Sequence, residues 1–134
     1  MNKKLPVAVV GIILAAFGVL PTHAQDLKAV LLKHANGWVL EWSNPDTGNR
    51  GVVEAVFADR GEKVVASLNI TDEGLFKSAV RSCERNVDIT ADTIRFDGCR
   101  DSGIVLIFDP SDIAYPLKSK NRSNNGYVYK GKAK

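Results

Sequence analysis

From residue 38 onward, short runs of alternating apolar and polar residues are separated by clusters of turn-forming residues. The first run places Trp38, Leu40 and Trp42 on one side of an extended chain, and the polar segment 44–49 predicts a reversal. The later runs are Gly51–Ala58, Glu62–Ile70, Val87–Ile89, Thr93–Phe96, Gly103–Asp109, Ile113–Ser119 and Gly126–Gly131. Eight or nine short strands of this kind avoid exposed edges by closing into a barrel or folding into a sandwich. We expect an all-β fold, a small antiparallel up-and-down β-barrel of about eight strands.

Two segments outside these runs carry further expectations. Asp26 can cap a short helix over Leu27–Ala35, which Asn36 and Gly37 would end. Residues 72–82 fit either a helix or a strand, because their apolar residues suit both spacings. The neighbouring strands favour a strand there.

The first 24 residues have the order of a secretory signal peptide. A basic segment with Lys3 and Lys4 precedes the 16-residue apolar run Leu5–Leu20, and the small residues Thr22 and Ala24 precede a cleavage point at Gln25. The apolar run is shorter than the roughly 20 residues that a membrane-spanning helix needs. We therefore expect residues 1–24 to be a signal peptide and residues 25–134 a single domain. The mature protein would be periplasmic or secreted, without a transmembrane span.

Charge is unevenly distributed along the mature chain. The formal net charge of the whole sequence is +3, but residues 25–112 hold 10 basic and 15 acidic side chains. From Ile113 onward there are six basic residues and no acidic one, interleaved with tyrosines. Basic and aromatic residues together are one pattern of polyanion or nucleic-acid binding, through attraction to phosphates and stacking of rings. The alternative is ordinary strand tyrosines with lysines that keep an edge soluble. The candidate interaction surface comprises Lys118, Lys120, Arg122, Tyr127, Tyr129, Lys130 and Lys132.

The two cysteines, Cys83 and Cys99, predict one disulfide in an exported protein. A two-residue turn at Ala91 and Asp92 would pair Ile89 with Ile94. Continued regularly, that ladder places the two cysteines on different faces, so a bridge needs one extra residue. Asp97 and Gly98 are suited to such a bulge.

Residues for catalysis are sparse. The mature chain has one histidine, His34, which the end of a helix explains without a catalytic role. No nucleophile elbow, phosphate-binding glycine loop or calcium loop is present in the sequence. Glu41 and Glu54 would form a carboxylate pair if both pointed into a barrel, and would face solvent otherwise. We expect no enzymatic activity, no cofactor and no metal.

Four aromatic side chains are expected to point into the barrel. Trp38, Trp42, Phe57 and Phe108 fall at apolar positions of the expected strands. Large rings there either line a cavity for a small apolar ligand or pack as core.

Two resemblances add to these expectations. Gly37-Trp38 on an early strand after a short helix resembles the calycin barrels, the lipocalin-like and avidin-like proteins, although their motif has one residue between Gly and Trp. This resemblance implies a ligand cavity and a basic residue of the last strand, here Lys130, packed against Trp38. The segment Gly126–Gly131 with its preceding Ser-Asn-Asn loop resembles the small periplasmic lysozyme inhibitors, which block an enzyme cleft with a loop.

The sequence thus predicts an exported, non-enzymatic binding protein that holds a small apolar ligand in a β-barrel. The alternative is a protein-interaction or inhibitor module, or a module that binds a polyanionic envelope partner through its basic C-terminal region. Nucleic acid is not the expected partner of an exported protein.

Overall fold

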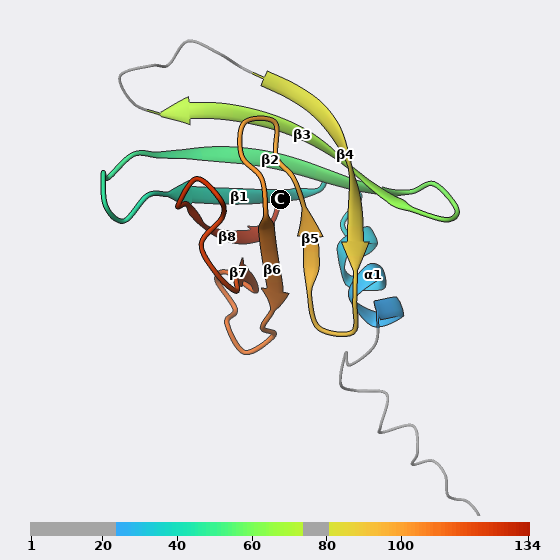
Figure 1. Ribbon diagram of the computed structural model, residues 1–134. Coiled ribbons are helices and arrows are strands. Elements are labelled where there is room, and N and C mark those ends of the chain that lie inside the picture. Colours follow the sequence, from blue (N-terminus) through green and yellow to red (C-terminus); the bar gives the residue numbers. More distant parts are fainter. Residues whose placement is uncertain (1–23, 74–80) are drawn as a thin grey trace, which may run out of the picture.

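The computed structural model describes residues 24–73 and 81–134, and the predicted signal peptide up to residue 23 lies outside these ranges. No helix in the described ranges is long and apolar enough to cross a membrane. One helix, α1 (Ala24–Lys33), precedes the strands in this part of the chain (Figure 1). The strands are β1 (Trp38–Ser43), β2 (Arg50–Asp59), β3 (Val64–Glu73), β4 (Arg81–Ile89), β5 (Ile94–Phe96), β6 (Ile104–Phe108), β7 (Leu117–Ser119) and β8 (Val128–Ala133).

The strands form one closed antiparallel barrel. Each strand pairs with its neighbours in sequence, and β8 closes the barrel against β1. Leu40 in the middle of β1 lies opposite Val53 of β2 on one side and Gly131 of β8 on the other. The predicted fold class, an all-β up-and-down barrel of about eight strands, is confirmed.

Side-chain alternation builds the core as the sequence pattern predicts. On β2, Val53, Ala55 and Phe57 are buried, whereas Val56 is exposed on the outside. Inward side chains of the other strands join them in one apolar cluster. Its fully buried large side chains are Trp38, Leu31, Leu40, Ile94, Leu106 and Leu117.

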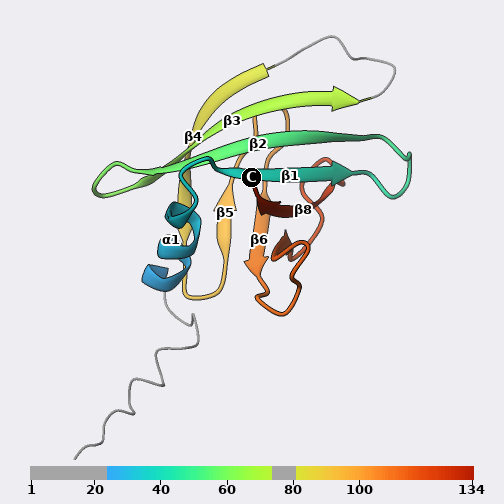
Figure 2. The same ribbon diagram turned by 180° about the vertical axis from the view of Figure 1, so that it is seen from behind.

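Helix α1 packs against the barrel, and both views place it beside β4 and β5 (Figures 1 and 2). Leu27 and Leu31 are buried in the same apolar cluster as the strands. The helix begins at Ala24 and ends at Lys33, so the predicted range Leu27–Ala35 was wrong at both ends. Asp26 lies within the first turn instead of before it, where its charge still suits the positive end of the helix dipole.

The predicted disulfide between Cys83 and Cys99 is present, with the two Cα atoms 5.7 Å apart. Ile89 pairs with Ile94, as the two-residue turn requires. Strand β5 ends at Phe96, and the Gly98 amide then donates to the Asp101 carbonyl at 2.9 Å. The ladder with β4 has already ended at Arg95, so residues 97–101 form a turn outside it and not the bulge that was predicted within it. This turn carries Cys99 to Cys83.

Two segments next to the strands were expected to be strand themselves. The strand predicted from Ile113 begins only at Leu117, because residues 109–116 form a hydrogen-bonded loop. The ambiguous stretch 72–82 is strand at both ends, in β3 as far as Glu73 and in β4 from Arg81. Residues 74–80 lie outside the described ranges.

Candidate functional site

The four aromatic side chains predicted to line a ligand cavity are all part of the apolar core or packed against it. Trp38 and Phe57 are buried, while Trp42 and Phe108 are half-buried. Phe57 packs edge to face on Phe96, with ring centres 6.2 Å apart, and Trp42 packs on Tyr127 at 4.8 Å. These two rings therefore already pack against other aromatic side chains of the protein.

Trp38 joins the barrel to the helix. Its indole Nε1 donates a hydrogen bond to the Leu31 carbonyl at 3.2 Å. Its ring packs edge to face with the His34 ring, with the two ring centres 4.9 Å apart. The Leu31 carbonyl lies near the C-terminal end of α1, where carbonyls lack partners within the helix. The calycin resemblance implies that Lys130 packs against Trp38, but Lys130 contacts Tyr115 instead. Lys130 is exposed on the outside of β8, with its ammonium 4.5 Å from the ring centre of Tyr115.

Two basic residues of the predicted interaction surface are paired with carboxylates of the protein. Lys118 is bound by two carboxylates, Asp112 at 2.7 Å and Asp109 at 3.5 Å, and Arg122 pairs with Asp46 at 2.9 Å. Lys120 is exposed. The acidic body thus neutralises part of the basic C-terminal region.

The two tyrosines of the predicted interaction surface also contact other residues of the protein. Tyr129 is buried, and its hydroxyl donates to the Asp101 carboxylate at 2.6 Å. Burial and then this hydrogen bond raise the pKa of Tyr129 far above its ordinary value. Tyr127 is held by its ring contact with Trp42. Tyr129 is therefore not available for stacking on a partner.

Lys130 and Lys132 remain together on the outside of the barrel. Their ammonium groups lie 4.5 Å and 5.5 Å from the ring centre of Tyr115, which is not among the residues of the predicted interaction surface. The Tyr115 hydroxyl donates to Glu41 at 2.9 Å. This hydrogen bond, with burial, raises the pKa of Tyr115. The ring is therefore fixed between the barrel wall and two cations.

Tyr115 belongs to the loop 109–116, which is held by hydrogen bonds at both ends. The Asp109 amide donates to the Pro116 carbonyl at 2.7 Å, which closes the loop. The Asp109 carboxylate accepts from the Ser111 amide at 3.0 Å, and the Asp112 carboxylate accepts from the Tyr115 amide at 3.0 Å. Hydrogen bonds from Ser111 lower the pKa of Asp109, and the bond from Lys118 lowers the pKa of Asp112.

Ile113 lies at the tip of this loop and is 93% exposed. Pro110 and Ala114 are also exposed. In Figures 1 and 2 the chain between β6 and β7 projects beyond the end of β6. The sequence pattern predicts a strand from Ile113, which is wrong at this end: Pro110 and Pro116 flank the segment, and neither can donate to a ladder.

The possible carboxylate pair does not form inside the barrel. Glu41 lies on the outside, bound to Tyr115, and the Glu54 carboxylate accepts from the Lys134 ammonium at 3.1 Å. Within residues 24–73 and 81–134, no group of three or more His, Cys, Asp or Glu side chains is placed to hold a metal ion.

Comparison with protein-family models, with curated proteins and with solved structures gives no match for this chain. The candidate site therefore depends on its own geometry: an ordered loop with an exposed apolar tip, beside an aromatic ring covered by two lysines.

Proposed function

We propose that the mature protein is an exported, non-enzymatic protein-binding module that presents the loop 109–116 to a partner protein. The observation that carries this proposal is Ile113, which is almost completely exposed at the tip of a hydrogen-bonded loop. A single exposed apolar residue is ordinary on a protein surface. Here Pro110 and Ala114 extend the apolar surface, and the loop backbone is fixed by the carboxylates of Asp109 and Asp112.

A loop ordered before binding loses less conformational entropy when it meets its partner. The tip fits a partner with an apolar recess, where Ile113 would be removed from water. Lys130 and Lys132 beside Tyr115 then favour a partner with carboxylates at the edge of that recess. The resemblance to the periplasmic lysozyme inhibitors also implies insertion of a loop into a cleft, but it lies in Gly126–Gly131 and the loop before it and does not point to the loop 109–116.

The two other hypotheses have less support from the geometry. A small apolar ligand inside the barrel would have to displace the packed rings of Phe57 and Phe96. A polyanion would meet a region in which Lys118, Arg122 and Lys134 already contact carboxylates. Both hypotheses stay predictions.

The test begins with a photo-crosslinking amino acid at position 113 of the mature protein, added to an extract of the cells that produce it. Position 56 is the matched control, because Val56 is an exposed apolar residue of the barrel wall outside the loop. A partner crosslinked from position 113 is then purified, and its affinity is measured by isothermal titration calorimetry for the unmodified protein, Ile113→Ser and Val56→Ser.

We expect Ile113→Ser to weaken binding about tenfold or more, which corresponds to about 1.4 kcal/mol or more. Val56→Ser should leave the affinity unchanged. A crosslinked protein that binds all three forms equally, or crosslinking from position 56 alone, would overturn the proposal.

A further inference from the structure

The disulfide between Cys83 and Cys99 lies where β4 and β5 have separated. The ladder between these strands ends at Arg95, and the turn 97–101 carries Cys99 to β4. Both cysteines pack against the core and keep part of their surface in contact with solvent. Neither belongs to the loop 109–116, so reactivity at this bond is independent of the proposed protein-binding function.

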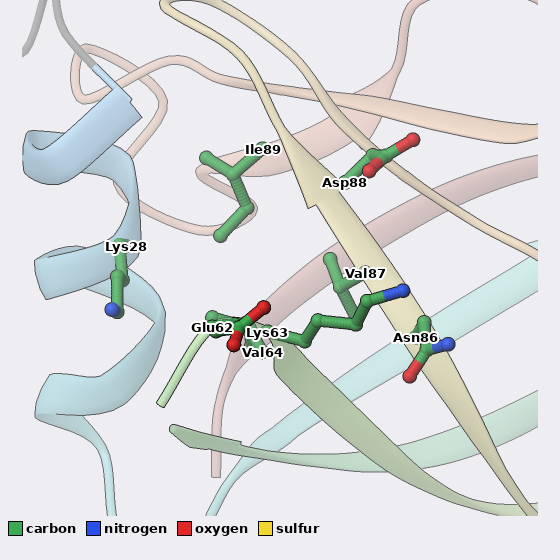
Figure 3. Close-up of a pocket in the computed structure, with 8 residues that line it drawn as sticks. All are labelled: Lys28, Glu62, Lys63, Val64, Asn86, Val87, Asp88 and Ile89. Carbon is green, nitrogen blue, oxygen red and sulfur yellow. The ribbon is translucent and has the colours of Figure 1, made fainter. Parts of the chain in front are cut away.

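Cys83 shares one face of β4 with two arginines. Side chains alternate along the strand, and Figure 3 shows this at its end, where Asn86 points away from Val87. The ladder with β3 is regular from there back to the start of β4, so the alternation continues. Val87 is buried on the barrel side. The residues that share its face are Arg85, Cys83 and Arg81.

The charge of these two arginines is not neutralised on that face. In the ladder with β3, the residues opposite Arg81, Cys83 and Arg85 are all buried and apolar. Neither arginine forms an ion pair with a carboxylate of the described residues. The Arg85 guanidinium donates to the Glu84 carbonyl at 3.0 Å, which keeps it beside the backbone next to Cys83. The Glu84 carboxylate lies on the outer face, where it meets Arg60 at 3.5 Å.

The turn around Cys99 has the opposite charge. Asp97 and Asp101 each stand two residues from Cys99, and with Arg100 they leave one negative charge in excess. A backbone amide donates to each of these carboxylates, at 3.0 Å and 2.8 Å, and holds it in place. A negative charge is therefore better stabilised on the Cys83 sulfur than on the Cys99 sulfur.

We propose that this disulfide exchanges with low-molecular-weight thiols, which become attached to Cys99. The incoming thiolate attacks the Cys99 sulfur and forms a new S–S bond. The bond between Cys83 and Cys99 breaks, and its electron pair leaves on the Cys83 sulfur as a thiolate. One disulfide is exchanged for another, so no oxidant or reductant is consumed, and the proton of the incoming thiol passes to water. A sulfur that holds negative charge better leaves faster, so attack at Cys99 is faster than attack at Cys83.

Exchange at this bond has a defined structural consequence. Residues 81–87 of β4 pair with β3, whereas the ladder to β5 begins only at Asp88. The disulfide is the covalent tie between this half of β4 and the turn 97–101. Among the described strands, a thiol on Cys99 therefore leaves the first half of β4 attached to β3 alone.

The first experiment measures how fast dithiothreitol opens the disulfide of the folded mature protein. Its second thiol releases the protein from the mixed disulfide, so opening is not reversed. Samples are stopped with acid, and the free thiols are counted by mass after alkylation. We expect the double variant Arg81→Gln/Arg85→Gln to open about three- to tenfold more slowly than the unmodified protein, because the leaving thiolate loses its cations.

Arg95→Gln/Lys120→Gln is the matched control. It also removes two exposed cations, but neither residue belongs to β4 or to the turn 97–101, and its rate should equal that of the unmodified protein. A loss of stability would speed the opening, so it cannot imitate the expected slowing. Equal rates in Arg81→Gln/Arg85→Gln and the unmodified protein would overturn the proposal.

The second experiment identifies the sulfur that takes up the thiol. The mature protein is mixed with reduced glutathione, exchange is stopped with acid, and peptic peptides are analysed by mass spectrometry. We expect about three- to tenfold more glutathione on Cys99 than on Cys83. Cysteamine, which has an amine and no carboxylate, should show the same preference, because the arginines act on the leaving sulfur and not on the reagent. Equal attachment to both cysteines, a preference for Cys83, or no mixed disulfide with either thiol would overturn the proposal.

Discussion

Gly131 occupies the position where β8 comes closest to the core of the barrel. It lies opposite Leu40 in the ladder with β1 and opposite Leu117 in the ladder with β7. A Cβ atom added there would overlap the Leu40 Cδ2 atom and lie 3.3 Å from the Leu117 Cβ atom. Both leucines are fully buried, so neither can move aside freely. We expect Gly131→Ala to lower the free energy of unfolding by about 1–3 kcal/mol, measured by urea denaturation.

The control for this prediction removes the side chain that a new methyl group would meet. In a Leu40→Ala background the overlap disappears, and alanine is then better suited to a strand than glycine. Gly131→Ala should therefore cost much less in that background than in the unmodified protein. Equal costs in the two backgrounds would show that close packing against Leu40 is not the reason for glycine at this position.

At the scale of elements, β4 and β5 depend on their covalent link. Their ladder joins only Asp88 to Arg95 and Ile89 to Ile94, whereas the disulfide joins Cys83 to Cys99 further along. The closed loop of 16 residues gives a stabilisation of about 3 kcal/mol in the chain-entropy model. Replacing both cysteines with alanine should lower the free energy of unfolding by about this amount in urea denaturation. A loss below about 1 kcal/mol would contradict the entropic estimate.

The loop 109–116 should lose its order in acid. The pKa values of Asp109 and Asp112 are both lowered in the folded protein by hydrogen bonds to their charged forms. Stabilisation by a carboxylate of lowered pKa is fully present above its unfolded value of about 3.9 and is lost as the pH falls through the folded value. We expect the Ile113 amide and methyl signals to become more mobile below about pH 4 in NMR relaxation measurements. An unchanged loop at pH 2 would contradict this prediction.

Replacement of Lys118 tests which partner lowers the pKa of each carboxylate in this loop. The hydrogen bond from Lys118 is the largest cause of the lowered pKa of Asp112, whereas Ser111 has the larger effect on Asp109. In Lys118→Met, which keeps most of the aliphatic stem, the pKa of Asp112 should rise more than that of Asp109. NMR titration of the two carboxyl carbons measures both values. A larger rise at Asp109 would reverse the assignment of partners.

Local sequence was a good guide to some elements and a poor one to others. The register of β4 and β5 could be predicted because a two-residue turn determines which residues face each other. The start of β7 could not, because Ile113–Pro116 continues the apolar run while its backbone is bound by Asp109 and Asp112. Side chains that bind nearby backbone groups compete with strand pairing, and alternation of apolar residues does not reveal that competition.

At the scale of the whole molecule, the barrel was predictable and the candidate site was not. Alternation of buried and exposed residues is local, and it specified the strands and the core. The neutralisation of the basic region depends on partners far apart in sequence: Arg122 meets Asp46, and Lys134 meets Glu54. Only barrel closure brings these charges together. A count of charges along the chain therefore overstated the cationic surface.

Helix α1 and the barrel share one core, which leads to a prediction for the entire fold. Leu31 is completely buried, and its carbonyl accepts the Trp38 indole hydrogen bond. Leu31→Ala removes a buried side chain that contacts both units, and such a change costs about 2–5 kcal/mol. If helix and barrel unfold together, hydrogen exchange should quicken by the same factor at the slowest amides of β1, β6 and β8 as in the helix.

Lys33→Ala is the control, because Lys33 is exposed on the same helix and its replacement should leave these exchange rates nearly unchanged. The competing possibility is a barrel that stays closed while the helix detaches. In that case, Leu31→Ala would quicken exchange in α1 alone and leave β6 protected. The burial of Trp38, whose ring contacts His34 at the end of the helix segment, argues against independent detachment. Separation would expose an indole at the start of β1 and leave its Nε1 without the Leu31 carbonyl.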